Sequence, residues 1–185
     1  MRNAAILVAA GRGLRAGGGV PKQWRALAGI SVAERSLRNF AEHPEITDLI
    51  LVIHPDDVAY AAALSTPCEI VHGGATREAS VRAGLDALGE HSIDNVLIHD
   101  AARPLVSGDI ISAVLAALEE TPGAAPALAV TDALWSGSHD RVSAPRDRTG
   151  LYRAQTPQGF HYDEIRAAHA AATSAAADDV ELSLI

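Results

Sequence analysis

Short runs of almost uninterrupted apolar residues recur along this chain, and longer segments with helical spacing separate them. The runs cover residues 4–10, 49–54, 68–72, 95–100 and 125–130. Runs without polar alternation are typical of parallel strands that are covered on both faces. Their alternation with helices predicts an α/β fold, with a mostly parallel open sheet and helices on both of its faces.

Helical spacing predicts helices over residues 31–41, 55–64, 78–88 and 107–120. The first opens with Ser-Val-Ala-Glu, a capping box in which the Glu34 side chain is expected to reach back to the first amide. In open α/β sheets, ligands bind beyond the carboxyl ends of the strands. The loops that follow Val8, His72 and Ile98 are therefore the places to look for a site.

The length of 185 residues predicts one domain, residues 1–185. Within it, residues 131–155 are polar, contain several turn-forming residues and arginines, and have no helical period. A segment this long without regular structure is uncommon in a compact domain. We predict an arm or hairpin that leaves the domain, and a long surface loop is the alternative.

Charge and cysteine content exclude several classes. The net charge of −8 argues against broad binding to nucleic acid or to an anionic membrane. Cys68 is the only cysteine, which rules out an intrachain disulfide and a cysteine-based zinc site. No apolar run approaches the roughly 20 residues of a membrane span, and residues 4–10 are short for a signal peptide. We expect a cytoplasmic protein.

The first apolar run leads into a glycine-rich stretch, VAAGRGLRAGGGVPKQ, at residues 8–23. Glycines allow backbone N–H groups to surround the oxygens of a phosphate. The stretch ends with Lys22, the only lysine in a chain whose other basic residues are arginines. A compact ammonium and a planar guanidinium are not interchangeable. We therefore interpret Lys22 as a residue kept for close contact with phosphate.

Two familiar phosphate motifs fit this stretch poorly. A P-loop ends in Gly-Lys-Ser or Gly-Lys-Thr, but Lys22 lies between Pro21 and Gln23. Residues 11–16 match the dinucleotide fingerprint, yet the acidic residue at the right distance, Glu34, is placed in a helix rather than at the end of the second strand. An NAD(P)-dependent oxidoreductase and a nucleotide-binding module without catalysis remain as less favoured alternatives.

A third motif fits in order and spacing. Residues 9–15 and 21–22 read A-A-G-x-G-x-R and P-K, which resembles nucleotidyltransferases that use nucleoside triphosphates. Four further stretches follow in register: HGGATREASVRAGL at 72–85, HDAARP at 99–104, DRTGLYRAQTPQGF at 147–160 and the acidic pair at 178–179. Together they resemble the 2-C-methyl-D-erythritol 4-phosphate cytidylyltransferases of the non-mevalonate isoprenoid pathway. A related enzyme that uses ribitol phosphate is the alternative.

The resemblance implies a Rossmann-like nucleotidyltransferase fold and a set of contacts to CTP. Arg15 and Lys22 would stabilise the charge on the reacting phosphates, with Mg²⁺ bound mainly through those phosphates and no dedicated protein ligands for the metal. The backbone that would cradle the triphosphate is that of Ala9, Ala10, Gly11 and Gly13. The groups implied around the base and ribose are the Gly74 and Ala75 backbone, the Ser80 hydroxyl, Arg77 as a brace for that loop, Asp100 and Ala101.

The resemblance also implies contacts to the acceptor sugar phosphate from Asp100, Arg103 and Arg148. Arg148 would come from the arm of a partner subunit, which implies a homodimer that dimerises through the arm. Two positions depart from the family pattern, since Ala133 and Ala177 stand where threonine is usual. The family also continues beyond the position of Ile185, so we expect a missing C-terminal tail or a fused cyclase that follows it.

Overall fold

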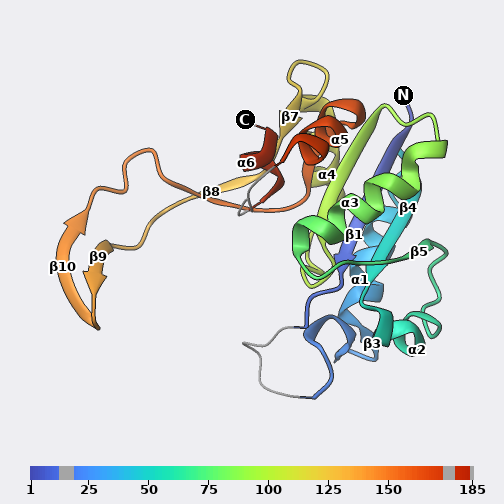
Figure 1. Ribbon diagram of the computed structural model, residues 1–185, viewed down its shortest axis with the longest axis horizontal. Helices are drawn as coiled ribbons and strands as arrows, with labels where there is room; N and C mark the ends of the chain where they lie inside the picture. Colours follow the sequence, from blue (N-terminus) through green and yellow to red (C-terminus); the bar gives the residue numbers. More distant parts are fainter. Residues whose placement is uncertain (13–18, 173–177, 184–185) are drawn as a thin grey trace.

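The computed structural model describes residues 1–12, 19–172 and 178–183, and a six-stranded sheet forms its centre (Figure 1). The strand order is β5-β4-β1-β6-β12-β7. Four neighbouring strands are parallel, and β12 runs antiparallel to both β6 and β7. The strands are β1 (Asn3–Ala9), β4 (Ile46–Ile53), β5 (Glu69–His72), β6 (Asn95–Asp100), β7 (Gly123–Ala124) and β12 (Gln158–His161). The predicted α/β class with a mostly parallel sheet is confirmed.

Helices cover both faces of the sheet, as predicted. Leu7 of β1 lies in one buried cluster, which contains side chains from α1 (Val32–Ala41) and α4 (Gly108–Ala117). The adjacent Ile6 lies in a second cluster, with side chains from α3 (Arg77–Ala87) and α5 (Tyr162–Ala171). Because successive side chains of a strand point to opposite faces, burial of both faces requires an uninterrupted apolar run. In the described ranges, no helix is long and apolar enough to span a membrane.

Some predicted elements differ from the structure. The segment 55–64 holds a 3-10 turn, Pro55–Asp57, and the four-residue α2 (Val58–Ala61) instead of one helix. A two-residue ribbon of β2 (Ala26–Leu27) and β3 (Ile30–Ser31) precedes α1. Ser31 caps α1 by accepting from the N–H of Glu34 at 3.1 Å. The Glu34 carboxylate, expected to reach back, instead accepts from Arg38 and Thr66.

The prediction that residues 125–130 form a strand of the sheet is wrong. Their strand, β8 (Ala127–Ala129), is exposed and pairs antiparallel with β11 (Tyr152–Ala154) outside the central sheet. Apolar composition alone does not decide which strand a segment pairs with, and here the partner is β11 rather than β6. The place beside β6 belongs to β12, whose Phe160 is buried in the second cluster.

The segment from β8 to β11, here called the arm, extends away from the sheet (Figure 1). Its outer part is a hairpin of β9 (Leu134–Ser138) and β10 (Arg141–Arg146). His139 and Asp140 connect these strands with φ angles of 50° and 59°, the left-handed pair that a two-residue hairpin turn requires. The hairpin interpretation of residues 131–155 is therefore correct, and the strand pairing starts earlier, at Ala127.

Candidate active site

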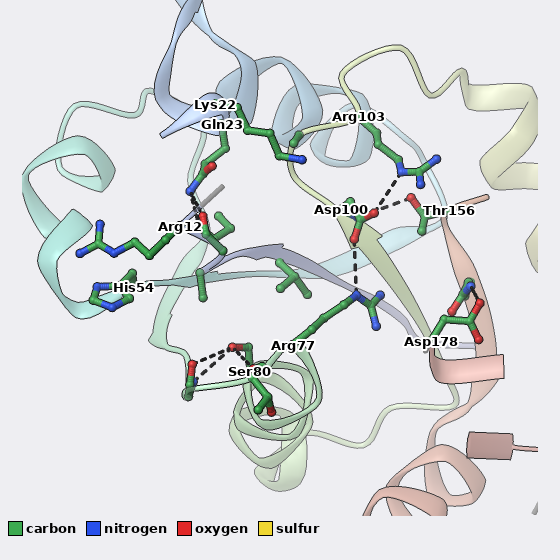
Figure 2. A pocket seen from close by; sticks show the side chains of 18 of the residues that line it. Arg12, Lys22, Gln23, His54, Arg77, Ser80, Asp100, Arg103, Thr156 and Asp178 are labelled. Carbon is green, nitrogen blue, oxygen red and sulfur yellow. Dashed lines mark hydrogen bonds and ion pairs between the residues drawn. The ribbon is translucent and has the colours of Figure 1, made fainter. Parts of the chain in front are cut away.

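A cleft of about 810 Å³ opens beyond the carboxyl ends of β1, β5 and β6 (Figure 2). The charged residues among its described lining are Arg12, Lys22, Arg77, Arg103, Asp100 and Asp178. Cations therefore outnumber carboxylates here, although the whole chain carries a net charge of −8. This local reversal of charge suits an anionic ligand.

The backbone after β1 forms the floor of the cleft and is held from below by one buried side chain. The Gln23 amide Nε2 donates to the carbonyl of Ala9 at 2.7 Å and to that of Gly11 at 3.1 Å. A Cβ atom at Gly11 would meet nothing within 4 Å, so this backbone is open to the cleft. The floor is thus fixed in shape and accessible to an anion.

Lys22 begins the 3-10 turn Lys22–Trp24 and extends across the cavity toward the side where Asp100 lies (Figure 2). The turn is anchored by Trp24, whose Nε1 donates to Oδ2 of Asp57 at 2.8 Å and whose ring stacks on Tyr60 at 5.6 Å. Within the described ranges, Lys22 forms no ion pair. Its ammonium is therefore available to a ligand.

The loop between β5 and α3 forms one wall of the cleft. In this loop, Gly73 and Gly74 pack closely against the first turns of α3, where Ser80 lies. The Ser80 hydroxyl is buried, accepts from the N–H of Gly74 at 3.2 Å and donates to the carbonyl of Thr76 at 2.9 Å. A Cβ on Gly73 would lie 2.6 Å from that hydroxyl. Ser80 thus shapes the loop, and a contact of its hydroxyl with a base stays a prediction.

Asp100 ends β6 and orients two arginines. Its Oδ2 accepts from Nε of Arg103 at 3.0 Å, and its Oδ1 lies 3.6 Å from Nε of Arg77. Arg103 also donates from Nη1 to Gln155 at 2.7 Å. These partners hold two long cationic side chains at the cleft before any ligand arrives.

Behind Asp100, a buried histidine fixes the neighbouring backbone. Burial lowers the pKa of His99 to about 4, so its ring is neutral near pH 7. Nε2 lies 3.0 Å from the carbonyl of Arg103, which can only accept, so Nε2 carries the hydrogen. The Thr156 hydroxyl then donates to Nδ1 at 2.9 Å and accepts from the N–H of Asp100 at 3.4 Å.

The acidic pair near the end of the chain has one member in the cleft and one behind it. Gln158 donates to Oδ2 of Asp178 at 3.1 Å and accepts from the N–H of Asp179 at 3.2 Å. The Asp179 carboxylate accepts from Nη1 of Arg77 at 2.7 Å and lies 3.1 Å from Nε2 of His169. Burial lowers the pKa of Arg77, but attraction and hydrogen bonding to Asp179, with Asp100 adding to them, outweigh burial and leave that pKa raised.

Most of the predicted site residues come together in the cleft: Ala9, Ala10, Gly11, Lys22, Gly74, Ala75, Arg77, Ser80, Asp100 and Arg103. Ala101 is fully buried beside the cleft, and its N–H donates to the carbonyl of Val8 at 3.1 Å. Arg148 lies in the arm, away from the cleft, where Nη1 donates to the carbonyl of Thr131. Gly13 and Arg15 lie outside the described residues.

Several cleft residues were not predicted individually. Gln23 belongs to the Pro-Lys-Gln triplet, and Gln155, Thr156 and Gln158 belong to the quoted AQTPQGF stretch, so the motifs pointed to the right segments without revealing roles. Arg12 belongs to the quoted glycine-rich stretch, again without a predicted side-chain role, and His54 had no such signal. Arg12 pairs with Asp56 and, at 3.0 Å, with Asp57, which ties the glycine-rich loop to the turn after β4.

Comparison with known proteins shows what the whole chain resembles. The profile of the 2-C-methyl-D-erythritol 4-phosphate cytidylyltransferase family matches residues 3–184. A relative of that name from Cereibacter sphaeroides is 55% identical over 99% of this chain and 83% of its own length. A "Bifunctional enzyme IspD/IspF" from Ruegeria pomeroyi is 58% identical over 99% of this chain and 48% of its own length. The Thermus thermophilus crystal structure of this cytidylyltransferase aligns with a TM-score of 0.80 and 29% identity, covering 100% of this chain and 84% of that one.

Proposed function

Because this chain belongs to the 2-C-methyl-D-erythritol 4-phosphate cytidylyltransferase family, we propose that the cleft beyond β1, β5 and β6 holds its two substrates. The protein is a cytidylyltransferase of the non-mevalonate isoprenoid pathway. It transfers CMP from CTP to 2-C-methyl-D-erythritol 4-phosphate and releases pyrophosphate. We propose that this reaction takes place in the cytoplasm.

The observation that carries the assignment of the cleft is Lys22, an ammonium without an ion-pair partner in the described ranges, set over an open glycine backbone. In the reaction, an oxygen of the acceptor phosphate forms a bond to the α-phosphorus of CTP. The bond from that phosphorus to the β-bridging oxygen breaks, and the pair of electrons leaves with pyrophosphate. The acceptor phosphate is largely dianionic near pH 7, so the step needs alignment and charge relief more than a strong base.

For the nucleotide, we assign the triphosphate to the backbone of Ala10 and Gly11 and the base to the loop of Gly74 and Ala75. Lys22 stabilises the charge that grows on the phosphates as pyrophosphate leaves. Arg15 shares that role in our proposal and lies outside the described residues. These assignments use two neighbouring parts of the lining, because the β5–α3 loop packs beside the floor: a Cβ on Gly73 would lie 2.7 Å from the Cβ of Ala10.

For the acceptor, we assign Asp100 and Arg103 from one subunit and Arg148 from the arm of a second copy. Two features of the arm support this assignment. Arg148 does not line the cleft of its own chain, and large apolar side chains are exposed on the arm, with Trp135 at 67% and Tyr152 at 65%. Exposed apolar side chains gathered on a protruding ribbon favour contact with another protein surface. We therefore propose a homodimer in which the arms complete the two clefts.

Members of this family use a divalent metal, and we propose Mg²⁺ bound mainly through the CTP phosphates. The cleft fits this mode of binding: its described carboxylates are Asp100 and Asp178, and both already accept hydrogen bonds from protein groups. No group of three or more candidate ligands occurs among the described residues. Mg²⁺ commonly keeps several waters and takes only one or two carboxylates beside phosphates. When bound, it would add positive charge at the phosphates.

The test is a coupled assay of pyrophosphate release with CTP, Mg²⁺ and each acceptor, 2-C-methyl-D-erythritol 4-phosphate or ribitol phosphate, in separate reactions. We expect release with the first acceptor, and a loss of at least about 10²-fold in turnover for Lys22→Ala. Lys22→Arg should recover little of that loss because the guanidinium is larger and planar. Turnover of the alanine variant close to that of the wild type would overturn the role of Lys22.

The shared cleft has its own test, in which two inactive homodimers are mixed. A Lys22→Ala chain supplies an intact Arg148, and an Arg148→Ala chain supplies an intact Lys22. A heterodimer would then contain one complete cleft, so mixing should restore up to about a quarter of the wild-type activity after subunit exchange. No recovery, with exchange verified by mass spectrometry, would contradict a cleft that is shared between subunits.

A further inference from the structure

The adjacent residues Asp178 and Asp179 serve different surroundings. Asp178 lines the cleft (Figure 2), whereas Asp179 is 1% exposed and its carboxylate is directed to Arg77 and His169. The Gln158 amide holds both residues, with Nε2 on Asp178 and Oε1 on the N–H of Asp179. The second aspartate is therefore not a spare cleft carboxylate, because its acceptor oxygens are used inside the protein.

Arg77 is the group through which Asp179 can reach the cleft. It starts α3, lines the cleft, and has its guanidinium between two carboxylates: Nη1 is 2.7 Å from Asp179, and Nε is 3.6 Å from Asp100. The separation from Asp100 exceeds hydrogen-bond length, so the short contact to Asp179 is the one that fixes the guanidinium. With Nη1 held by Asp179 and Nε facing Asp100, Nη2 has no hydrogen bond to the described residues and can donate to a ligand.

Asp179 is itself held by a rigid support. His169 of α5 is 1% exposed, and its Nε2 lies 3.1 Å from Oδ1 of Asp179. The carbonyl of His169 accepts from Arg82 of α3, and the Tyr162 hydroxyl of α5 donates to the carbonyl of Leu85 of α3 at 2.8 Å. These bonds fix α5 against the helix that carries Arg77. The position of the imidazole therefore sets the position of the carboxylate relative to that helix.

The orientation of His169 indicates what the ring is used for. A carboxylate oxygen accepts, so Nε2 carries the hydrogen in this contact. Nδ1 is buried and has no hydrogen-bond partner among the described residues. The contact from Nε2 to Asp179 is therefore the one side-chain hydrogen bond that His169 makes to the described residues. A buried nitrogen without a hydrogen-bond partner costs free energy, and support of the Asp179 carboxylate accounts for a histidine at this position.

We infer that Asp179, supported by His169, is a positioning residue that holds Arg77 in the conformation that binds the nucleotide. This inference rests on the proposed function, since it takes the cleft as the CTP site. Arg77 lies across the cavity from Lys22 (Figure 2), so it contacts the nucleotide away from the phosphates that react. Contacts that are equal in the ground state and the transition state change KM and leave kcat unchanged. Attraction to Asp179 and Asp100 keeps the pKa of Arg77 raised despite its burial, so its charge is permanent.

The experiment measures KM for CTP and kcat in the full-length chain at a temperature where thermal melts show every variant folded. Asp179→Asn should raise KM for CTP about fivefold, as expected when one charge-assisted hydrogen bond is weakened, with kcat within about twofold. His169→Leu should raise KM about threefold, and His169→Gln, whose amide can donate in place of Nε2, should stay within about twofold of the wild type. The matched control is Asp48→Asn, which removes a carboxylate bound to Arg2 and His91 and should leave KM unchanged.

A double-mutant cycle separates positioning from general damage. If Asp179 acts through Arg77, then adding Asp179→Asn to Arg77→Gln should change KM for CTP by less than about twofold. The same fivefold increase in that background, or an unchanged KM for Asp179→Asn alone, would overturn the inference. An unchanged KM for Arg77→Gln would also overturn it, while the proposed function would fail only if the wild type released no pyrophosphate. If Asp179→Asn does not fold, the two His169 variants decide in the same way.

Discussion

Two clusters, each made of an aspartate, an arginine and a histidine, lie at opposite ends of the parallel strands, here called the carboxyl edge and the amino edge of the sheet. At the carboxyl edge, Asp179 binds Arg77 and His169. At the amino edge, Asp48 binds Arg2 and His91, with the His91 Nδ1 at 3.0 Å from Oδ1. Composition therefore does not distinguish them, and any difference in what they do has to come from geometry and burial.

The geometry of the arginine differs between the two. Arg2 places Nε and Nη2 on the two oxygens of Asp48, at 2.9 and 2.8 Å, so both anchored nitrogens serve one carboxylate. Arg77 is divided between Asp179 and Asp100 and faces a cleft. In a bidentate pair, two nitrogens of the arginine bind both oxygens of one carboxylate, and the contact contributes to the stability of the fold. An arginine that is shared between two carboxylates is held in one orientation and can still bind a ligand in the cleft.

Burial differs as well. The side chains of Asp179 and His169 are each 1% exposed, whereas Asp48 is 11% and His91 is 34% exposed; the two arginines differ less, at 33% for Arg77 and 47% for Arg2. Water competes for the groups at the amino edge and screens their charges. The cluster at the carboxyl edge is shielded, so each loss of a partner there is costly. The two clusters contain the same residue types. What distinguishes the one beside the cleft is that its carboxylate is buried and that its arginine is shared between two carboxylates.

The largest expected difference is in the free energy of unfolding. Asp179→Asn leaves the half-buried Arg77 with Asp100 as its remaining carboxylate, at 3.6 Å, and should cost about 3 kcal/mol, as when one partner of a buried pair is removed. Asp48→Asn should cost about 1 kcal/mol, because its partners Arg2 and His91 are partly exposed and water screens the pair. Urea denaturation of both variants beside the wild type measures the two values. Equal losses would remove the distinction between a shielded and a solvated cluster.

The next difference concerns activity. Arg77→Gln should lower kcat/KM for CTP about 20-fold because it removes a charged donor from the part of the cleft that we assign to the nucleotide. Arg2→Gln should leave kcat/KM within about twofold, since Arg2 lies at the opposite edge of the sheet. The coupled assay of pyrophosphate release compares them under one condition. A loss of activity in Arg2→Gln as large as that in Arg77→Gln would show that the cleft residue acts only through stability.

The sequence predicted those parts of the fold in which the cause is local. β6 was predicted with its observed bounds, 95–100, because burial on both faces demands a continuous apolar run. β12 was missed because it starts with Gln158, a buried amide that is satisfied by Asp178 and Asp179, 20 and 21 residues further along the chain. A polar residue whose partners are that distant reads as a loop residue. The run at 125–130 was misplaced because apolar composition does not reveal a strand's partner, and β8 pairs with β11 of the arm.

The candidate site divides along the same line. Lys22 and the glycine backbone were predicted because the motif that contains them is contiguous. The contact of Arg77 with Asp179 joins residues 102 positions apart, and nothing in the sequence tells which of two adjacent aspartates faces the cleft. The expected contact of Ser80 with the base shows a related limit, because its hydroxyl has backbone partners within its own loop. The role of Arg148 depends on a second chain and stays a prediction.

Acid should affect the amino-edge cluster in a defined window. Burial raises the pKa of Asp48, but hydrogen bonds from Arg2, Thr47 and His91 outweigh it and lower that pKa to about 2. The unfolded chain, with an ordinary aspartate pKa of 3.8, then binds the proton first as the pH falls. A contribution on the order of 1 kcal/mol is therefore present above about pH 4 and lost toward pH 2. The difference in unfolding free energy between wild type and Asp48→Asn should shrink over that interval, and a constant difference would contradict the lowered pKa.

The smallest expected difference is the effect of salt on the destabilisation caused by each substitution, which depends on how far water reaches each cluster. Raising NaCl from about 0.05 M to about 0.5 M shortens the Debye length and weakens charge pairs that water can reach. The destabilisation caused by Asp48→Asn should then fall by a few tenths of a kcal/mol, whereas that caused by Asp179→Asn should not change. Urea denaturation at the two salt concentrations gives both values. An equal decrease would mean that water reaches Asp179 as freely as Asp48, and a carboxylate so exposed could not hold Arg77 in one conformation for the nucleotide.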